Sequence, residues 1–478
     1  MRKLRVKLPL KTILLIICAI STFYLLLQQP SICLSSSPDP PFTTTAAAAA
    51  ASPTTLSHLL FSIASYSAAF RRRKPILKLW YTPNSTRALL FLDSPPSIDP
   101  ELLGLPPAVV SASTSRFPYT FPRGQRSAIR VARIVKEAVD RDEQNVRWFV
   151  FGDDDTVFFP QNLVTVLGKY DHEKWYYVGS NSESLEQNLK MSFEMAYGGG
   201  GFAISFPLAK ALARVLDSCL MRYPHLYGSD LRISSCVAEL GVGLTREPGF
   251  HQVILLPLLY SNVSVLHLGD VFGMLTSHPL SPLLSLHHLE VVEPIFPNMD
   301  RIEALEHLFK AVNVDPGRIL QQTVCYDRPS NVTISVVWGY GIQIFEGNQL
   351  LPNILASQRT FKPWRRGGVS DSSQFVIDTR DYPRDRCKRP VVFFLEDVAF
   401  GTGRLWSKYR RYTAHRCPNT FAVRDIKHIS VYAKKQHQDI GKAMAPRRQC
   451  CDIIHPFGKS MVLDIRDCGF DELIAMEA

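Results

Sequence analysis

Two hydrophobic periods alternate along the chain after residue 54, and they predict strands followed by helices. From Arg126 to Arg141, apolar side chains recur on one face at helical spacing. Val146 to Phe151 is a mostly apolar run of the kind found in buried strands. Ser205 to Leu220 again has a helical pattern, with Pro207 in its first turn. Strands that alternate with helices predict an α/β sandwich with a largely parallel sheet.

The segment before these elements predicts three more. Thr55 to Phe70 is expected to be a helix that ends at the basic run Arg71 to Lys74. That run is either a solvated turn or a processing site. Leu77 to Tyr81 and Ala88 to Leu92 are expected to be strands, and Asp93 closes the second.

The first residues of the chain have a different pattern. Five basic residues lie within residues 1–11, and an apolar run follows from Ile13 to Leu27. Counted from Leu8, this run has about 20 residues, which is roughly the thickness of a bilayer core. Because basic residues precede it and no small-residue cleavage signal follows, an uncleaved anchor is favoured over a cleaved signal or a transit peptide. We therefore expect a cytoplasmic tail (1–11), a transmembrane signal anchor (12–27) and a flexible Ser/Pro/Thr/Ala-rich stem (28–53).

Composition narrows the class of protein. The chain has 478 residues, 46% of them apolar, and a net charge of +11. These proportions exclude global disorder, and a single apolar run excludes a multi-span membrane protein. Because the positive charge is spread along the chain, it indicates topology rather than binding to nucleic acid. Asn84, Asn262 and Asn331 begin glycosylation triplets, as a luminal domain would have.

Ten cysteines fit the same luminal location. Cys18 lies in the expected anchor and Cys33 in the stem, so eight remain for the folded part. An even set of luminal cysteines predicts disulfides, although their connectivity cannot be read from the sequence. Cys450 and Cys451 are adjacent, and we expect them to pair with different partners.

The clearest chemical signal is the run Gly152 to Phe159, which contains Asp153, Asp154 and Asp155. Three carboxylates directly after a buried strand are costly unless a cation lies among them, and ligands bind at the carboxyl ends of strands in open α/β sheets. Such oxygens suit Mg²⁺ or Mn²⁺ bound to a diphosphate. The alternative is a solvated acidic turn.

Two enzyme classes use such a motif. A nucleotide-sugar transferase uses it to hold metal and diphosphate, and a luminal phosphatase would use Asp153 as its nucleophile. About 80 folded residues precede the motif, and no later Gly-Asp-x-x-x-Asp motif is found, so the phosphatase is disfavoured.

Three later motifs favour the transferase. Tyr197 to Ser205 contains four consecutive glycines, including Gly199 and Gly200, which let the backbone approach a sugar closely or simply form a flexible turn. Asp230 is either a general base or a helix cap. His251 is either a metal ligand or a structural histidine. His287 and His288 lack other metal-ligand residues nearby in the sequence, and we expect them to be structural.

The C-terminal part changes character at Cys325. Several strand patterns follow, among them Val332 to Val337 and Ile429 to Ala433, so residues 325–478 are expected to form a β-rich domain. Trp338, Tyr340 and Trp364 could stack on a sugar or fill a core; the core is expected.

Several runs resemble the plant fringe-related proteins of glycosyltransferase family 31. They are Trp148 to Thr156, Ser180 to Ser184, Tyr197 to Ser205, Tyr227 to Asp230, Phe250 to Gln252, Leu286 to Leu289, Val291 to Asn298 and Pro446 to Cys451. The resemblance implies a Golgi type II membrane protein with a GT-A-like catalytic domain (54–324). It also implies an Mn²⁺- or Mg²⁺-dependent, inverting hexosyltransferase. Such an enzyme would transfer a sugar from a UDP-sugar to a glycan or glycoprotein, forming a β-1,3 linkage.

The resemblance also assigns roles to residues. These are metal binding by Asp155, Asp153 and His251, catalysis by Asp230 as the base, and donor binding by Asp153, Asp154, Gly199, Gly200, Asp93 and Arg126. A catalytically inactive glycan- or partner-binding protein of the same fold is the alternative.

The chain departs from the family in two places. It has Ser229-Asp230 where many members have an acidic pair. Residues 254–268 are inserted after the Phe-His-Gln motif, either as a real loop or as an unspliced intron in the gene model.

Overall fold

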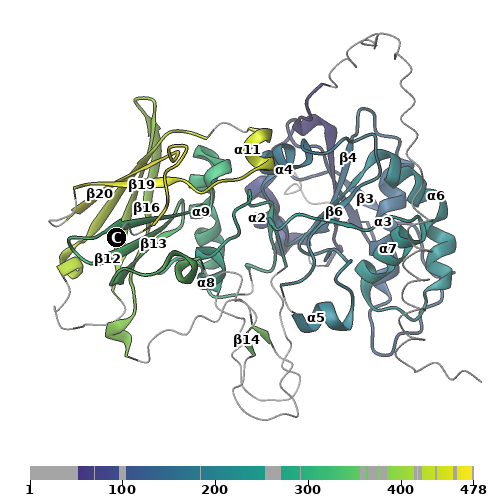
Figure 1. Ribbon diagram of the computed structural model, residues 1–478. Coiled ribbons are helices and arrows are strands. Elements are labelled where there is room, and N and C mark those ends of the chain that lie inside the picture. The colour runs from purple at the N-terminus through teal and green to yellow at the C-terminus, as the bar shows by residue number, and fades with distance from the viewer. Residues whose placement is uncertain are drawn as a thin grey trace, which may run out of the picture. The chain divides into compact units, whose positions relative to one another are not determined.

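The computed structural model describes most of the chain after residue 51. The described residues are 52–68, 70–95, 104–183, 185–252, 271–290, 292–355, 362–363, 375–376, 385–413, 417, 422–436, 439–455 and 460–475. Pro53–Ala478 form one compact unit (Figure 1). The predicted tail, anchor and nearly all of the stem lie outside the described residues, as does the insertion at 254–268. No helix among the described residues combines the length and the apolar character that a membrane crossing requires.

The N-terminal part of this unit is built on a seven-stranded sheet with the order β3-β2-β1-β4-β7-β6-β8. Four of its strand pairings are parallel, and β7 pairs antiparallel with both of its neighbours, so the sheet is mixed. The strands are β1 (Leu59–Ala64), β2 (Ala88–Leu92), β3 (Ala108–Val110), β4 (Trp148–Asp153), β6 (Tyr177–Gly179), β7 (Phe202–Ser205) and β8 (Leu244–Arg246).

Side chains on the central strands alternate between two cores. In β4, Trp148 and Val150 belong to one core, whereas Phe149 and Phe151 belong to the other. Neighbouring residues of a strand point to opposite faces, so both faces of this sheet are buried. Burial on both faces explains why the strand sequence is apolar without alternation.

Helices cover both faces (Figure 1). One face is covered by α3 (Ser127–Asp140), α6 (Phe206–Arg222) and α7 (Gly228–Glu239). The other is covered by α2 (Phe70–Trp80), α4 (Pro160–Leu167) and α9 (Arg301–Val314). Smaller elements near the edge are α5 (Leu185–Lys190), α8 (Val271–Thr276), and a three-stranded sheet of β5 (Val157–Phe158), β10 (Ser285–Leu286) and β9 (Phe250–His251).

The C-terminal part is an eight-stranded sheet, as the β-rich pattern predicts. Its order is β11 (Gln322–Asp327), β12 (Val332–Val337), β13 (Gly341–Glu346), β16 (Val391–Gly401), β17 (Arg404–Tyr412), β18 (His428–Ala433), β20 (Ser460–Arg466) and β19 (Cys450–His455). α9 packs against this sheet as well as against α2, so one apolar core is continuous between the two parts. The predicted division at residues 324/325 falls within β11. Trp338 and Tyr340 are core residues, as expected, and Trp364 lies outside the described residues.

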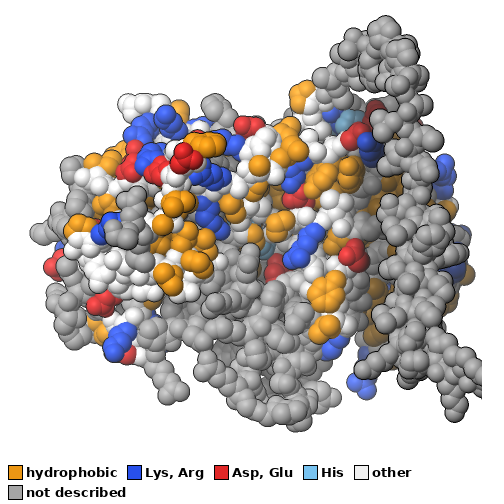
Figure 2. Space-filling model, in the orientation of Figure 1, with side chains coloured by type: hydrophobic (Ala, Val, Ile, Leu, Met, Phe, Trp, Pro, Cys, Tyr) orange, Lys and Arg blue, Asp and Glu red, His pale blue; other side chains and the backbone are white. Residues whose placement is uncertain are grey.

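Besides two 3-10 turns (Arg386–Lys388 and Ala422–Asp425), the described C-terminal part has four further short elements. These are α10 (Leu351–Ile354), β14 (Lys362–Pro363) paired with β15 (Phe375–Val376), and α11 (Ile440–Met444). On the face shown in Figure 2, Lys and Arg side chains gather, with some acidic ones, over the C-terminal strands.

All eight cysteines that the sequence assigns to the folded part form disulfides. The pairs are Cys219–Cys236, Cys325–Cys451, Cys387–Cys417 and Cys450–Cys468. The first joins α6 to α7 and the second joins β11 to β19. The expectation that Cys450 and Cys451 have different partners is confirmed.

Two predicted elements near the start of the fold were wrong. Residues 55–70 contain a short 3-10 turn followed by β1, and residues 77–81 overlap the end of α2. β1 is buried on both faces, so its apolar run carries no period that separates a strand from a helix. The helices predicted at 126–141 and 205–220 and the strands predicted at 88–92 and 146–151 are confirmed.

Candidate active site

The three aspartates lie at the carboxyl end of β4, a central strand of the sheet. Asp153 is its last residue, and Asp154 and Asp155 follow in a turn, where both are buried. Thr156 fixes this turn: its Oγ1 accepts a hydrogen bond from the Asp153 N–H (2.9 Å) and donates to the Gly199 carbonyl (2.8 Å). A solvated acidic turn is therefore the wrong interpretation.

A single arginine compensates much of the buried negative charge. The Arg73 guanidinium lies 3.1 Å from Asp155 Oδ2 and 3.5 Å from Asp154 Oδ1, and it also donates to Glu290. Asp154 accepts a further hydrogen bond from Ser65 Oγ at 2.5 Å. The basic run at 71–74, expected to be a solvated turn or a processing site, thus lies in α2 and supplies a cation to the site.

His287 contacts the Asp155 oxygen that Arg73 does not. Its Nε2 lies 3.0 Å from Asp155 Oδ1 and 3.8 Å from Asp153 Oδ2, and His288 Nε2 lies 3.7 Å from Asp155 Oδ2. Asp155, His287 and His288 each offer a ligand atom within a space small enough to hold one metal ion. The sequence gives this histidine pair no metal-ligand residues nearby, but the fold brings it to Asp155.

The ionisation of these groups follows from their contacts. Burial alone would raise the pKa of Asp155, but His287, His288 and Arg73 outweigh it and lower that pKa. Burial alone would lower the pKa of His287, but Asp155 raises it. Burial, and after it the neighbouring Asp155 carboxylate, raises the pKa of Asp153, but the exposure of 42% of its side chain limits the effect of burial. Asp155 and His287 therefore form an ion pair.

His251 does not join this group. It pairs in register with Leu286, the residue before His287, but its side chain makes other contacts. Its Nδ1 lies 3.0 Å from Glu183 Oε1, and its Nε2 lies 2.9 Å from His278 Nδ1. The structure places His287, rather than His251, beside Asp155.

Asp230 lies in the first turn of α7 without capping it. The N-cap residue is Tyr227, and the Asp230 carboxylate accepts hydrogen bonds from Ser229 Oγ (2.9 Å) and from the Gly198 N–H. Burial raises the pKa of Asp230. Asp153, Gly198, Ser229 and Asp230 line one small cavity, so this carboxylate opens toward the same space as the acidic turn.

The backbone of the glycine run lies close to both Asp230 and His287. A Cβ at Gly198 would lie 2.6 Å from Asp230 Oδ1, and one at Gly199 would lie 2.2 Å from His287 Cε1. The Gly200 carbonyl accepts a hydrogen bond from Ser285 Oγ. The absence of side chains at 198 and 199 is therefore what lets Asp230 and His287 approach the backbone. This close packing favours the close-approach interpretation over a plain flexible turn.

Comparison with known proteins agrees with this arrangement. The model of the family described as "Protein of unknown function, DUF604" matches residues 187–451, more than half of the chain. The chain belongs to the DUF604 family. A "Fringe-like" family model matches residues 54–266 of this DUF604 protein, and the matches support a fringe-related protein of the glycosyltransferase family 31 type.

Two curated relatives are proteins named beta-1,3-glucosyltransferase, from Mus musculus and Homo sapiens. Each is 28% identical to the DUF604 protein over 120 residues, which are 25% of this chain and 23% of the relative. The chain thus spans about a quarter of the length of these relatives.

The two weaker donor-binding candidates lie at the margin of the site. Asp93 is exposed and accepts hydrogen bonds from the backbone and hydroxyl of Ser67. Arg126 donates to three carbonyls of the loop at residues 114–117, so the structure gives it a role in holding that loop. Arg130 was not among the predicted site residues. It donates to the carbonyls of Ser65 and Phe91 and interacts electrostatically with Asp93 and Asp153.

Proposed function

We propose that this DUF604 protein transfers a hexose from a UDP-sugar to a hydroxyl of a glycan or glycoprotein, with inversion, forming a β-1,3 linkage. The fringe-like match and the names of the two relatives support a glycosyltransferase of β-1,3 type. The observation that carries the proposal is the pairing of Asp155 with His287 at the end of β4, beside a cavity that Asp230 lines.

The residues fit a divalent metal ion. Asp155, His287 and His288 offer ligand atoms close enough together for one ion, and Asp153 Oδ2 lies 3.8 Å from His287 Nε2; a mixed oxygen and imidazole set suits Mn²⁺ better than Mg²⁺. Nε2 is the His287 nitrogen that faces the carboxylates, and Nδ1 is buried without a hydrogen-bond partner among the described residues. When bound, the metal would neutralise charge on the diphosphate of the donor.

Asp230 is the proposed general base. The attacking acceptor hydroxyl gives its proton to the Asp230 carboxylate while its oxygen forms a bond to the anomeric carbon. The bond from that carbon to the diphosphate oxygen breaks, and UDP leaves with the bonding electrons. A base needs a pKa closer to neutrality than that of an ordinary aspartate, and burial supplies that shift.

The apolar side of the Asp230 cavity favours this chemistry. Ala64, Val131, Phe151 and Phe202 line it together with the two aspartates. A wall of this kind limits water near the base, so competing hydrolysis of the donor is reduced.

We also propose that the protein is a single-pass type II protein of the Golgi membrane with this site in the lumen. The basic N-terminal residues and the apolar run after them support that topology. Four disulfides support an oxidising compartment. Asn84 and Asn331 are exposed, as glycosylation would require.

The test is binding and turnover of a panel of UDP-sugars by the full-length chain, with Mn²⁺, with Mg²⁺ and with a chelator. Metal-dependent binding of one donor that Asp155→Ala abolishes would support the proposal and identify the sugar. Binding without any turnover on a broad acceptor panel would support the inactive, glycan-binding alternative. A variant lacking residues 254–268 belongs in the same panel; donor binding only in that variant would identify the insertion as the cause of inactivity.

A further inference from the structure

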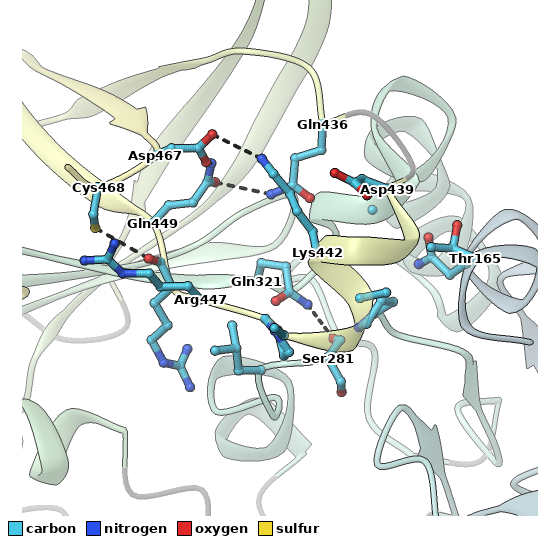
Figure 3. A pocket seen from close by; sticks show the side chains of 18 residues that line it. Thr165, Ser281, Gln321, Gln436, Asp439, Lys442, Arg447, Gln449, Asp467 and Cys468 are labelled. Atoms are coloured by element: carbon cyan, nitrogen blue, oxygen red, sulfur yellow. Dashed lines mark hydrogen bonds and ion pairs between the residues drawn. The ribbon is translucent and has the colours of Figure 1, made fainter. Parts of the chain in front are cut away.

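A second cavity lies on the boundary between the fringe-like part and the C-terminal sheet. Its volume is about 340 Å³, within the range of small-molecule sites, and 18 residues line it (Figure 3). Thr165 of α4 and Ser281 contribute from one side, whereas Lys442 of α11, Gln449 and Asp467 contribute from the C-terminal part. None of the 18 lining residues belongs to the acidic turn of the candidate active site, so this is a separate site.

Arg448 supplies an uncompensated positive charge to this cavity. Its Nη1 donates to the Gln322 carbonyl at 3.3 Å, and within the described ranges no carboxylate forms an ion pair with it. Burial lowers the pKa of Arg448, and no acidic neighbour offsets that effect. A guanidinium remains charged in proteins, so a partly buried one without a counter-ion favours an anionic ligand.

The carboxylates of the cavity are already engaged. Asp467 pairs with Lys442 Nζ at 3.1 Å and accepts a hydrogen bond from Gln449 Nε2 at 2.9 Å. Asp439 caps α11 by accepting from the Gly441 N–H at 2.8 Å. Arg447, next to Arg448, donates to the carbonyls of Gly469 and Glu472. These bonds leave Arg448 as the cation that is available to a ligand.

The rest of the lining suits sugar hydroxyls. Gln321, Gln436 and Gln449 lie around the same space (Figure 3). Each Nε2 already donates one hydrogen bond, to the Ser281 carbonyl, Gln449 Oε1 and Asp467 Oδ1 respectively, and an amide NH₂ has a second N–H for a hydroxyl. The Ser281 hydroxyl is buried and has no partner among the described residues. None of the lining residues is aromatic, so recognition would rest on hydrogen bonds and charge instead of stacking.

We propose that this cavity binds the carboxylate-bearing unit of an acidic saccharide, with Arg448 at the carboxylate and the glutamine amides at the hydroxyls. Binding of this kind does not depend on the transferase activity proposed above. In a transferase, the site would hold an acidic sugar of the acceptor, and that extension rests on the proposed function.

The test is titration of the full-length protein with the methyl glycosides of glucuronic acid and galacturonic acid, followed by calorimetry or ligand-observed NMR. The matching methyl glucoside and galactoside, and acetate, are the comparison ligands. We expect the acidic glycosides to bind at least about tenfold more tightly than either kind of comparison ligand. Equal binding of the neutral sugars, or of acetate alone, would overturn the proposal. No UDP-sugar or metal is needed, so failure here is distinct from failure of the proposed function.

Variants then assign the binding to Arg448. We expect Arg448→Gln to weaken binding of the acidic glycosides by about 10- to 100-fold, and the adjacent Arg447→Gln to change it less than about twofold. Asp467→Asn should tighten binding by a few fold, because it removes a negative charge while keeping a hydrogen-bond acceptor; a gain of this kind cannot come from misfolding. Unchanged binding in Arg448→Gln, or weaker binding in Asp467→Asn, would overturn the assignment.

Discussion

Asp155 and His287 are 132 residues apart in the chain, and the Oδ1 of the first lies 3.0 Å from the Nε2 of the second. β10 makes this contact possible because it pairs with both β5 and β9, which places the residue after its end opposite the acidic turn. The candidate active site therefore depends on strand pairing between distant parts of the chain.

This pairing gives a direct test of the metal ligands. We expect His287→Ala to weaken Mn²⁺ binding on the order of 100-fold, because it removes an imidazole beside Asp155. His251→Ala should change Mn²⁺ affinity far less, because His251 bonds to Glu183 and His278 instead. Manganese titration followed by electron paramagnetic resonance measures both. A larger loss in His251→Ala would show that the metal lies elsewhere.

Local motifs in the sequence predicted part of this site. The acidic triplet follows an apolar strand and the four glycines precede one, so both signals lie within a few residues. His287 could not be found in the same way, since its partner is distant and its own neighbourhood has no metal-binding spacing. Arg73 was missed for a related reason: the run at 71–74 was expected to be a solvated turn or a processing site, whereas it lies in α2 and places Arg73 beside Asp155.

The helices and strands that were predicted correctly also have a pattern that is visible in the local sequence. α3 and α6 have one apolar face each, so their helical period was visible in the sequence. β1 is buried on both faces and carries no period, and the strand was mistaken for part of a helix.

The glycine run should tolerate a methyl group at one position and not at its neighbours. A Cβ at residue 199 would lie 2.2 Å from His287, and one at residue 198 would lie 2.6 Å from Asp230, so either must displace a group of the site. At residue 200 the nearest atom would be 3.4 Å away. We expect Gly198→Ala and Gly199→Ala to lose most donor turnover, whereas Gly200→Ala retains it.

Circular dichroism and thermal melting provide the control, since all three variants should fold. Two measurements separate their effects: Gly199→Ala should impair Mn²⁺ binding, and Gly198→Ala should impair turnover with Mn²⁺ binding preserved. Equal activity of the three variants would contradict the close approach of His287 and Asp230 to this backbone.

The pH dependence of turnover should report the protonation of Asp230. Burial raises the pKa of this carboxyl, and a base must be deprotonated, so turnover should fall as the pH decreases through the raised value. Asp230→Asn should lower kcat by about 10²- to 10⁴-fold, remove that pH limb and leave donor affinity unchanged.

Ser229→Ala is the matched variant for this assignment. The Ser229 hydroxyl donates to Asp230 and favours its charged form, so removing it should move the acidic limb to higher pH with the base still present. An unchanged limb in Ser229→Ala, or an Asp230→Asn protein with normal kcat, would show that another group takes the proton.

Arg73 should matter most for stability when no metal is bound. It lies 3.1 Å from Asp155 and 3.5 Å from Asp154, and it also pairs with Glu290, so Arg73→Gln removes the cation that these three carboxylates share. Removing one partner of a buried ion pair costs about 3–5 kcal/mol; since 23% of the Arg73 side chain is exposed, we expect about 2–3 kcal/mol of unfolding free energy.

A divalent ion at Asp155 would add positive charge next to the same carboxylates. The loss of stability in Arg73→Gln should therefore be larger in a chelator than in saturating Mn²⁺, as measured by denaturant unfolding under both conditions. Arg71→Gln, from the same helix, controls for loss of one positive charge on α2. If Arg73→Gln were destabilised to the same extent with and without Mn²⁺, the metal would not lie beside the carboxylates that Arg73 contacts.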